Sequence, residues 1–293
     1  MQEDTKKPQL DFVGIGFTKC GSTWIYKLLE EHPEICMSKT KETNFFANYD
    51  LVAEPRKLKY FEEFFPRDCG DRIKGEFSPM YIARDIALKN LVEHYPKVKF
   101  LVILRNPVEK RISEVMYNYR LKSDVEKLDL DRVIQERFRD KPEQKTYSPR
   151  LAEWLQAFPS ENFHIMILEE FARDPYNKIS ELYDFLGVDN SFRPQVAEQK
   201  ANTAHGFRHP KLQKRLRNAH KRVKRHPRLA KALKSVSRPL KLKQRIMAWN
   251  KKQFRRPQVS TETKRILLDL HRKDIEELEK LLNKDLSIWK NSL

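Results

Sequence analysis

The feature that most constrains the fold is an alternation of short apolar runs with longer amphipathic stretches. The runs are DFVGIGF, EICMS, RIKGEFS, KFLVILR and NFHIMIL, and all except EICMS lead into a helical pattern. Apolar runs without a polar side indicate strands that are buried on both faces. Strands of this kind joined by helices predict an α/β fold with a central parallel sheet flanked by helices. The order of the strands stays open.

Helical spacing is clear at both ends of the chain. Ile25, Leu28 and Leu29 follow the first apolar run at offsets that place them on one helix face, and His32-Pro33 indicates where this helix ends. The stretch TETKRILLDLHRKDIEELEKLL predicts a helix near the C-terminus, with Thr261 or Thr263 as its cap.

Length and charge predict how the chain is divided. A chain of 293 residues fits one domain, 1–293, with an α/β core at 10–200. The net charge of +18 is concentrated in 201–261, where 20 Lys and Arg residues occur without a single Asp or Glu. Prolines divide this basic, mainly helical segment into short pieces. The remaining 262–293 form a C-terminal helix that we expect to pack on the core.

The basic segment 201–261 has several interpretations. Such a charge block favours contact with a polyanion, either by attracting an anionic acceptor or by peripheral contact with a membrane surface. Nucleic-acid binding is a weaker hypothesis, because no zinc finger or aromatic-interleaved motif accompanies the charge. A solvated basic face without a specific partner is the remaining alternative.

The cysteines and the N-terminus bear on the compartment. Cys20, Cys36 and Cys69 form neither an even set nor a C-x-x-C pair, so we expect reduced thiols, no disulfide and no zinc site. The stretch MQEDTKKPQL is polar, and no apolar run reaches the length of a membrane span. These features predict a cytoplasmic protein without a transmembrane segment.

The turn after the first apolar run, GFTKCGSTW, has the pattern of an anion site. A strand, a glycine turn and a helix start together present backbone N–H groups to an anion. Lys19 adds a positive charge, Gly21 allows close approach, and Ser22 and Thr23 add hydroxyl donors. In a nucleotide kinase the lysine would follow the second glycine, where this chain has Ser22. The lysine position therefore disfavours a kinase.

A second motif, KFLVILRNPVEKRISEVMYNY, also contains residues that can bind a phosphate. It predicts a buried strand whose last residue is Arg105, a turn at Asn106-Pro107 and a helix that contains Ser113. A guanidinium can bind a terminal phosphate with two parallel hydrogen bonds, and a serine can bind the same group. The strand ends without the Asp that would hold Mg²⁺ in a kinase, so no metal is implied.

Together these two motifs resemble those of the sulfotransferases that use 3′-phosphoadenylyl sulfate (PAPS), with some similarity to the glycosaminoglycan branch. The first resembles the family's 5′-phosphosulfate loop and the second its 3′-phosphate motif. The stretches KGEFSPMY, LEEFARDPYNKISELYDFLGV and DIEELEKLLNKDLSIW are also similar, so the resemblance covers about Phe12 to Trp289. It implies a P-loop NTPase-like sulfotransferase fold, PAPS as donor, the bisphosphate PAP as product, and no metal.

The resemblance also implies roles for individual residues. The donor site would comprise Lys19, Cys20, Gly21, Ser22, Thr23, Trp24, Arg105, Ser113 and Arg208. Lys19 would neutralise the leaving phosphate. Glu42, in the element E-x-x-F-F, would be the base that deprotonates the acceptor, with Glu76 as a weaker alternative. The glycosaminoglycan enzymes usually carry lysine where this chain has Phe77, which counts against a sulfated-polysaccharide acceptor.

The predicted function is therefore transfer of a sulfuryl group from PAPS to a hydroxyl or amine. The acceptor could be a carbohydrate, a lipid or a small metabolite, and the basic charge suits an anionic one. Two alternatives stay open: a nucleotide-dependent P-loop kinase, and a non-catalytic polyanion-binding protein. The sequence distinguishes neither O- from N-sulfation nor one oligomeric state from another.

Overall fold

The structure is a computed structural model that describes residues 9–48, 51, 54–119, 128–138, 146–198, 205–207, 209, 212, 215, 249–253 and 257–290. The chain divides into two compact units. The first consists of Met1–Lys110, Pro142–Ala201 and Leu267–Leu293, and the second of Arg111–Lys141 and Asn202–Ile266. Whether the chain is one domain with boundaries at 200 and 261 stays a prediction.

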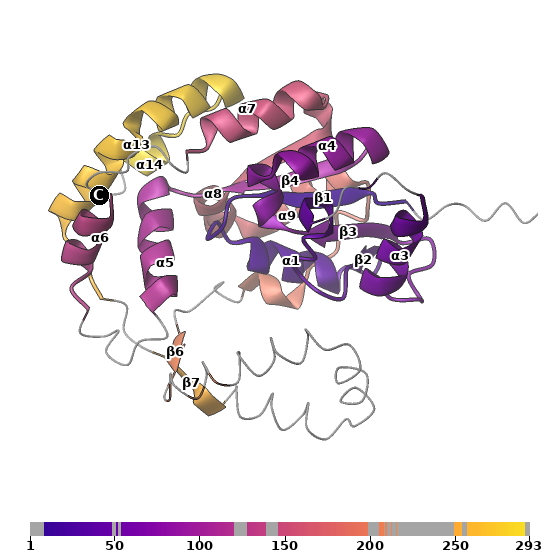
Figure 1. The fold of residues 1–293 in the computed structure, drawn as a ribbon, viewed down its shortest axis with the longest axis horizontal. Coiled ribbons are helices and arrows are strands. Elements are labelled where there is room, and N and C mark those ends of the chain that lie inside the picture. The colour runs from indigo at the N-terminus through magenta and orange to yellow at the C-terminus, as the bar shows by residue number, and fades with distance from the viewer. Residues whose placement is uncertain are drawn as a thin grey trace, which may run out of the picture. The chain divides into compact units, whose positions relative to one another are not determined.

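A parallel sheet forms the centre of the first unit (Figure 1). Its strands are β1 (Phe12–Gly16), β2 (Ile35–Met37), β3 (Ile73–Phe77), β4 (Lys99–Leu104) and β5 (Phe163–Ile167). They are arranged in the order β2-β3-β1-β4-β5, and every neighbouring pair is parallel. All five strands coincide with the predicted apolar runs, so the predicted α/β class is confirmed. The order, which places β1 at the centre, was not readable from the sequence.

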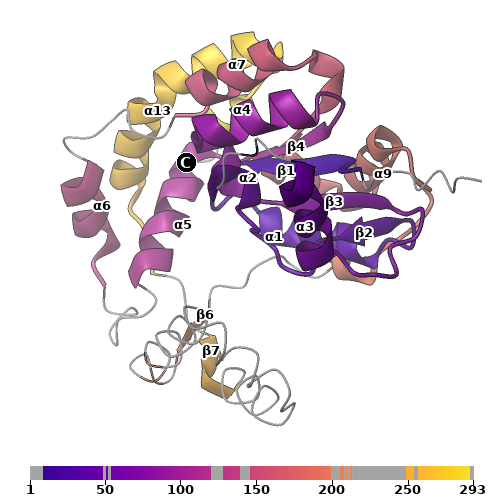
Figure 2. The same ribbon diagram turned by 45° about the vertical axis from the view of Figure 1, so that its right-hand side comes forward.

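Helices cover both faces of this sheet. Figures 1 and 2 show α4 (Asp85–His94) and α7 (Ser148–Ala157) on one face and α1 (Ser22–Glu31) on the other. The other helical elements of the first unit are α2 (Phe45–Asn48), α3 (Glu54–Phe64), α8 (Leu168–Arg173), α9 (Pro175–Leu186), α14 (Ser287–Lys290) and the 3₁₀ turns η1 (Pro79–Ala83), η3 (Ser160–Asn162) and η4 (Gln195–Glu198). Helix α1 ends at Glu31 with His32 as its C-cap, in agreement with the predicted stop at His32-Pro33, and Ile25, Leu28 and Leu29 are buried.

Strands β1 and β3 pack through aromatic rings set over glycines. Phe12 pairs with Gly75, and Gly14 pairs with Phe77. A Cβ atom on Gly75 would lie 2.0 Å from the Phe12 ring, and one on Gly14 would lie 2.2 Å from the Phe77 ring. Any larger residue would push the strands apart, because a packed interior leaves no room for an added methyl group.

Two helices pass from one unit to the other, α5 (Pro107–Tyr119) and α13 (Thr261–Leu282). In the first unit, Ile275 and Leu278 of α13 join the hydrophobic core. The predicted caps of α13 were wrong: the Ser260 hydroxyl accepts a hydrogen bond of 3.2 Å from the Thr263 amide. The helix starts at Thr261, so the residue before it has the cap geometry.

The second unit also contains α6 (Leu130–Phe138) and a short antiparallel ribbon of β6 (His205–Phe207) and β7 (Lys251–Gln253). The ribbon lies in the basic segment 201–261, which had been predicted to be mainly helical. His209 stacks on Trp249 there, with ring centroids 5.4 Å apart. Most of the basic segment lies outside the described residues.

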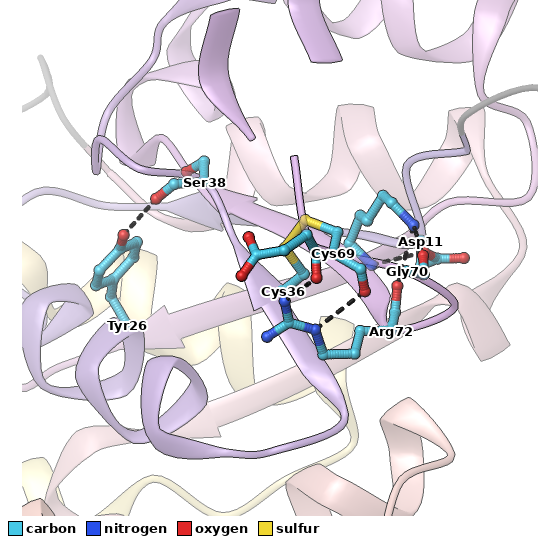
Figure 3. Close-up of a disulfide and its surroundings, with 9 residues drawn as sticks. Asp11, Tyr26, Cys36, Ser38, Cys69, Gly70 and Arg72 are labelled. Atoms are coloured by element: carbon cyan, nitrogen blue, oxygen red, sulfur yellow. Dashed lines mark hydrogen bonds between the residues drawn. A yellow bond between two sulfur atoms is a disulfide. The ribbon is translucent and has the colours of Figure 1, made fainter. Parts of the chain in front are cut away.

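A disulfide joins Cys36 of β2 to Cys69, in the turn before β3 (Figure 3). The prediction of three reduced thiols was therefore wrong. An odd number of cysteines does not exclude one bonded pair, and the pairing of β2 with β3 brings these two Cα atoms to 5.6 Å. Around the bond, Arg72 donates to the Cys69 carbonyl and Tyr26 to the Ser38 carbonyl. Cys20 is a free, buried cysteine.

Candidate functional site

The loop between β1 and α1 is curled by residues in left-handed backbone conformations. Lys19 has φ 69° and Gly21 has φ 94°. Gly21 caps α1, and its carbonyl accepts a hydrogen bond of 2.8 Å from the Trp24 amide. The amides at the very start of a helix have no acceptor within it. The loop therefore has the shape of an anion cradle, with the helix dipole adding favourable potential.

Space around Gly21 is limited by the start of α8. A Cβ atom at this position would lie 2.6 Å from Cδ1 of Leu168. Glycine is thus required twice, once for the positive φ and once for the contact with Leu168. The sequence motif reflects both requirements.

The Arg105 side chain reaches back to the same loop. Arg105 was predicted to be the last residue of its strand, but β4 ends at Leu104 and Arg105 follows it. Because β4 pairs with β1, both loops leave the same edge of the sheet. Its Nη1 donates to the Lys19 carbonyl at 3.0 Å, and its Nη2 lies 3.4 Å from the Glu109 carboxylate. The side chain is 20% exposed. A guanidinium has five N–H donors, so these two contacts leave capacity for a phosphate.

The other predicted donor residues differ in accessibility. Thr23 is exposed, whereas Ser22 is buried. The Cys20 thiol is fully buried, which raises its pKa to about 11. The Trp24 indole is also buried, and its N–H donates to the Val196 carbonyl at 3.3 Å. Because the side chains of Cys20 and Trp24 are buried, these two residues could contact a ligand only through their backbone atoms.

Two predicted donor residues lie beyond this loop. Ser113 is half-buried in α5, at the position that the sequence motif indicates. Arg208 lies outside the described residues. Their roles in donor binding stay predictions.

Glu42 lies in the segment that follows β2. It has φ 65°, and its amide donates to the Phe77 carbonyl at the end of β3 with a distance of 2.9 Å. The side chain is 53% exposed and forms an ion pair of 2.7 Å with Lys41. Since β3 is adjacent to β1, Glu42 lies at the same edge of the sheet as the β1 loop. An accessible carboxylate at this edge can serve as a base.

Glu76, the weaker base candidate, is fully buried at the end of β3. Three hydroxyls donate to its carboxylate: Ser78 at 2.9 Å, Tyr81 at 2.6 Å, and Thr43. Burial raises the pKa of the Glu76 carboxyl, and these hydrogen bonds oppose that shift. A carboxylate enclosed in this way cannot contact an acceptor. Through Thr43, Glu76 instead anchors the segment that carries Glu42.

Phe77 occupies the position where the glycosaminoglycan enzymes carry lysine. It is 1% exposed, and its ring lies over Gly14. The position therefore belongs to the core and contributes no cation to the site.

Four further residues lie near Arg105, and three of them were not identified from the sequence. The Tyr147 hydroxyl donates to the Arg105 carbonyl at 2.7 Å. The ammonium of Lys110, which is almost fully buried, lies 5.3 Å from the centre of the Tyr147 ring. Glu169 and Trp289 hydrogen-bond the neighbouring Asn106. The motif itself indicated Lys110, but the other three come from distant segments and carry no local signal.

Metal and membrane features were searched in the parts of the chain that the structure describes. There, no three His, Cys, Asp or Glu side chains are grouped in a way that could hold a metal ion. Within the same residues, no helix combines the length and apolar character needed to cross a bilayer. Chemistry without a metal stays a prediction.

Comparisons with known proteins agree with this geometry. The sulfotransferase domain family matches residues 10–263, which ends before Trp289. Heparan sulfate glucosamine 3-O-sulfotransferase 6 of Mus musculus is 27% identical over 183 residues, covering 59% of this chain and 51% of that protein. Membrane-associated sulfotransferase kil1 of Dictyostelium discoideum is 28% identical over 108 residues, covering 37% of this chain and 23% of that one. The chain thus spans about half or less of the length of these two relatives.

One solved structure supports the fold over nearly the whole chain. A sulfotransferase from Alicyclobacillus acidocaldarius superimposes with a TM-score of 0.64 at 20% identity, covering 97% of this chain and all of that one. The predicted sulfotransferase fold is confirmed.

Proposed function

The chain belongs to the sulfotransferase domain family, and from that premise we propose that it transfers a sulfuryl group from PAPS to a carbohydrate hydroxyl or amine. The observation that carries the proposal is the hydrogen bond of 3.0 Å from Arg105 to the Lys19 carbonyl. It joins the motif for the 3′-phosphate to the motif for the 5′-phosphosulfate. One nucleotide with a phosphate group at each end can then contact both.

The β1 loop and Arg105 fit such a donor. The loop is curled at Lys19 and Gly21, the first amides of α1 have no acceptor within the helix, and Arg105 keeps N–H groups beyond its two contacts. PAPS supplies an activated sulfuryl group, and its 5′-phosphate leaves with an added negative charge. Lys19 and the amides of Gly21 to Thr23 would neutralise that charge. Stabilisers of this kind each contribute about 10²–10³ in rate.

Glu42 is the proposed base. It would accept the proton of the acceptor hydroxyl or amine as that atom bonds to sulfur, while the bond from sulfur to the 5′-phosphate oxygen breaks. Its exposure of 53% keeps the carboxylate within reach of an acceptor. The Lys41 ammonium lies 2.7 Å from this carboxylate, so the acceptor would approach beside a positive charge.

Two observations support a carbohydrate acceptor. The relatives named for heparan sulfate glucosamine match more than half of this chain. The net charge of +18, concentrated in 201–261, would attract a polyanionic glycan by long-range steering. This chain has Phe77 where the glycosaminoglycan enzymes usually carry lysine, which counts against an acceptor that is already sulfated. The assay therefore compares an unsulfated glycan with a sulfated one.

Calorimetric titration tests donor recognition. The protein is titrated with PAP and, separately, with ATP plus Mg²⁺. The proposal expects tight binding of PAP and weak or no binding of ATP. The reverse preference would reject it in favour of a nucleotide kinase.

A transfer assay then tests the reaction. Radiolabelled PAPS is offered with an unsulfated glycosaminoglycan, its N-sulfated form, a lipid hydroxyl and a small phenol. Label in a glycan supports the carbohydrate proposal, and label only in the lipid or phenol contradicts it. Binding of glycan without transfer would identify a polyanion-binding protein.

The compartment also stays a prediction. The cytoplasm was predicted from the polar N-terminal stretch and the lack of a long apolar run, whereas the disulfide between Cys36 and Cys69 favours an oxidising compartment. A thiol count on protein alkylated during isolation and then denatured separates the two. One reactive thiol, from Cys20, supports an oxidising compartment, and three support the cytoplasm.

A further inference from the structure

The turn that carries Arg105 is held by a ring of three hydrogen bonds. The Asn106 amide donates to Oε1 of Glu169 at 3.0 Å. The Trp289 indole donates to Oε2 of the same carboxylate at 3.0 Å. The Asn106 side-chain amide donates to the Trp289 carbonyl at 3.2 Å, which closes the ring. Residues from three distant segments thus meet at one turn.

Asn106 is engaged from every side. Its Oδ1 accepts from the Val108 amide at 2.9 Å and so caps the start of α5. Asn106 is 1% exposed and Trp289 is fully buried, so water cannot replace their hydrogen bonds. These hydrogen bonds hold the backbone next to Arg105 in its present conformation.

Arg105 itself is held at both ends. Its carbonyl accepts from the Tyr147 hydroxyl at 2.7 Å, and its guanidinium donates to the Lys19 carbonyl at 3.0 Å. A small rotation of the turn would move the end of this long side chain by much more than the backbone. The direction of the guanidinium thus depends on the bonds around Asn106.

We propose that Glu169 and Trp289 are positioning residues that aim Arg105 at the 3′-phosphate of the donor. The inference rests on the proposed function and extends it: the C-terminal helix α14 takes part in selecting a 3′-phosphorylated nucleotide. Neither residue contacts the donor. Both act through Asn106.

The test uses Trp289→Phe with a matched control, Trp154→Phe. Both tryptophans are buried, and each donates its indole N–H inside the first unit, Trp154 to the Ile82 carbonyl at 3.3 Å. Phenylalanine removes the N–H and keeps an aromatic ring in each case. Both variants should lose similar thermal stability, so stability alone does not distinguish them.

The decisive measurement is selectivity for the 3′-phosphate. Affinities for PAP and for adenosine 5′-monophosphate, which lacks that phosphate, are measured by calorimetry and expressed as a ratio. Trp289→Phe should lower this ratio about tenfold, as expected when a hydrogen bond to a charged group is weakened. Trp154→Phe should leave it unchanged. An unchanged ratio in a folded Trp289→Phe protein overturns the inference.

A second variant covers the case in which Trp289→Phe does not fold. Glu169→Gln keeps the shape of the side chain but places an amide N–H₂ against one of the two donors, and it should also lower the ratio. If it does not, the inference is likewise overturned. If the unmodified protein shows no preference for PAP over the monophosphate, the proposed function fails first, and the two failures are thereby distinguished.

Discussion

The proposed donor side of the site, at Arg105, and the proposed acceptor side, at Glu42, are held in different ways. On the donor side, Arg105 and its turn are fixed by hydrogen bonds to the β1 loop, to Tyr147 and to the Glu169–Trp289 pair. On the acceptor side, Glu42 is half-exposed, with an ion pair to its neighbour Lys41 and a backbone bond to Phe77. The Arg105 turn is fixed by several hydrogen bonds from distant segments. The Glu42 carboxylate lies in a surface loop, and only the neighbouring residues of that loop are held in place.

This difference matches what each side has to recognise. A nucleotide of fixed chemistry is recognised best by groups that are already in place before it binds. An acceptor that varies between proteins of one fold is recognised by loops, because loops change without disturbing the core. Glu76 and the disulfide anchor the acceptor segment, while leaving the Glu42 carboxylate accessible.

The largest expected effect is on the acceptor side. Glu42→Gln should lower turnover by about 10²–10⁴, because a positioned base contributes that much, and should leave PAP affinity unchanged. Single-turnover transfer and calorimetry measure the two quantities. Glu30→Gln, at an exposed position of α1, is the control. Unchanged turnover in Glu42→Gln would remove this residue from its role.

The second-largest effect is expected when the disulfide is removed. Replacing Cys36 and Cys69 by serine should lower the free energy of unfolding by about 2–4 kcal/mol, since the bond closes a long loop. The loop contains Glu42, so turnover should fall more than PAP affinity. Denaturant melts with and without dithiothreitol provide the control, because a reductant should destabilise the unmodified protein and not the double variant. A reductant without effect on the unmodified protein contradicts the prediction.

On the donor side, Gly21→Ala should weaken PAP binding about tenfold to hundredfold. The added Cβ would lie 2.6 Å from Leu168, and the alanine would have to adopt a φ of 94°. Both effects strain the β1 loop. Gly70→Ala is the matched control, with φ 54° and no atom within 4 Å of the added Cβ. It should cost roughly 1–2 kcal/mol of stability and no PAP affinity. Equal PAP affinities in the two variants would mean that the β1 loop does not hold the donor.

The smallest effect is expected at the anchor of the acceptor segment. Thr43→Val removes the hydroxyl that bonds Glu76 and should lower turnover about twofold to tenfold, the equivalent of one buried hydrogen bond. Thr40→Val, at an exposed position of the same segment, should change turnover little. Equal turnover in both variants would show that Glu76 does not position Glu42.

Local patterns were sufficient for the elements and for the donor motifs. Strands β1 and β4 were predicted because a strand buried on both faces is mostly apolar, and this is visible in a short window. The other three strands were predicted from the alternation of such runs with helices. The loop at Lys19 and Gly21 was recognisable because an anion cradle restricts its residues at adjacent positions. The Ser260 cap was missed because several hydroxyl residues near Thr261 fit the same pattern.

The sequence by itself determined that a parallel α/β protein would place two phosphate motifs at strand ends. Only the tertiary structure decided that these ends are adjacent, that Cys36 meets Cys69, that Glu76 is buried among hydroxyls, and that Glu169 and Trp289 hold the turn at Asn106. The physical reason is the separation along the chain over which each kind of interaction acts. Hydrophobic periodicity and turn chemistry act between neighbours in the chain. The disulfide, the hydrogen bond from Thr43 to Glu76 and the bonds of Glu169 and Trp289 to Asn106 join residues 33 to 183 positions apart, which only the packed fold brings together.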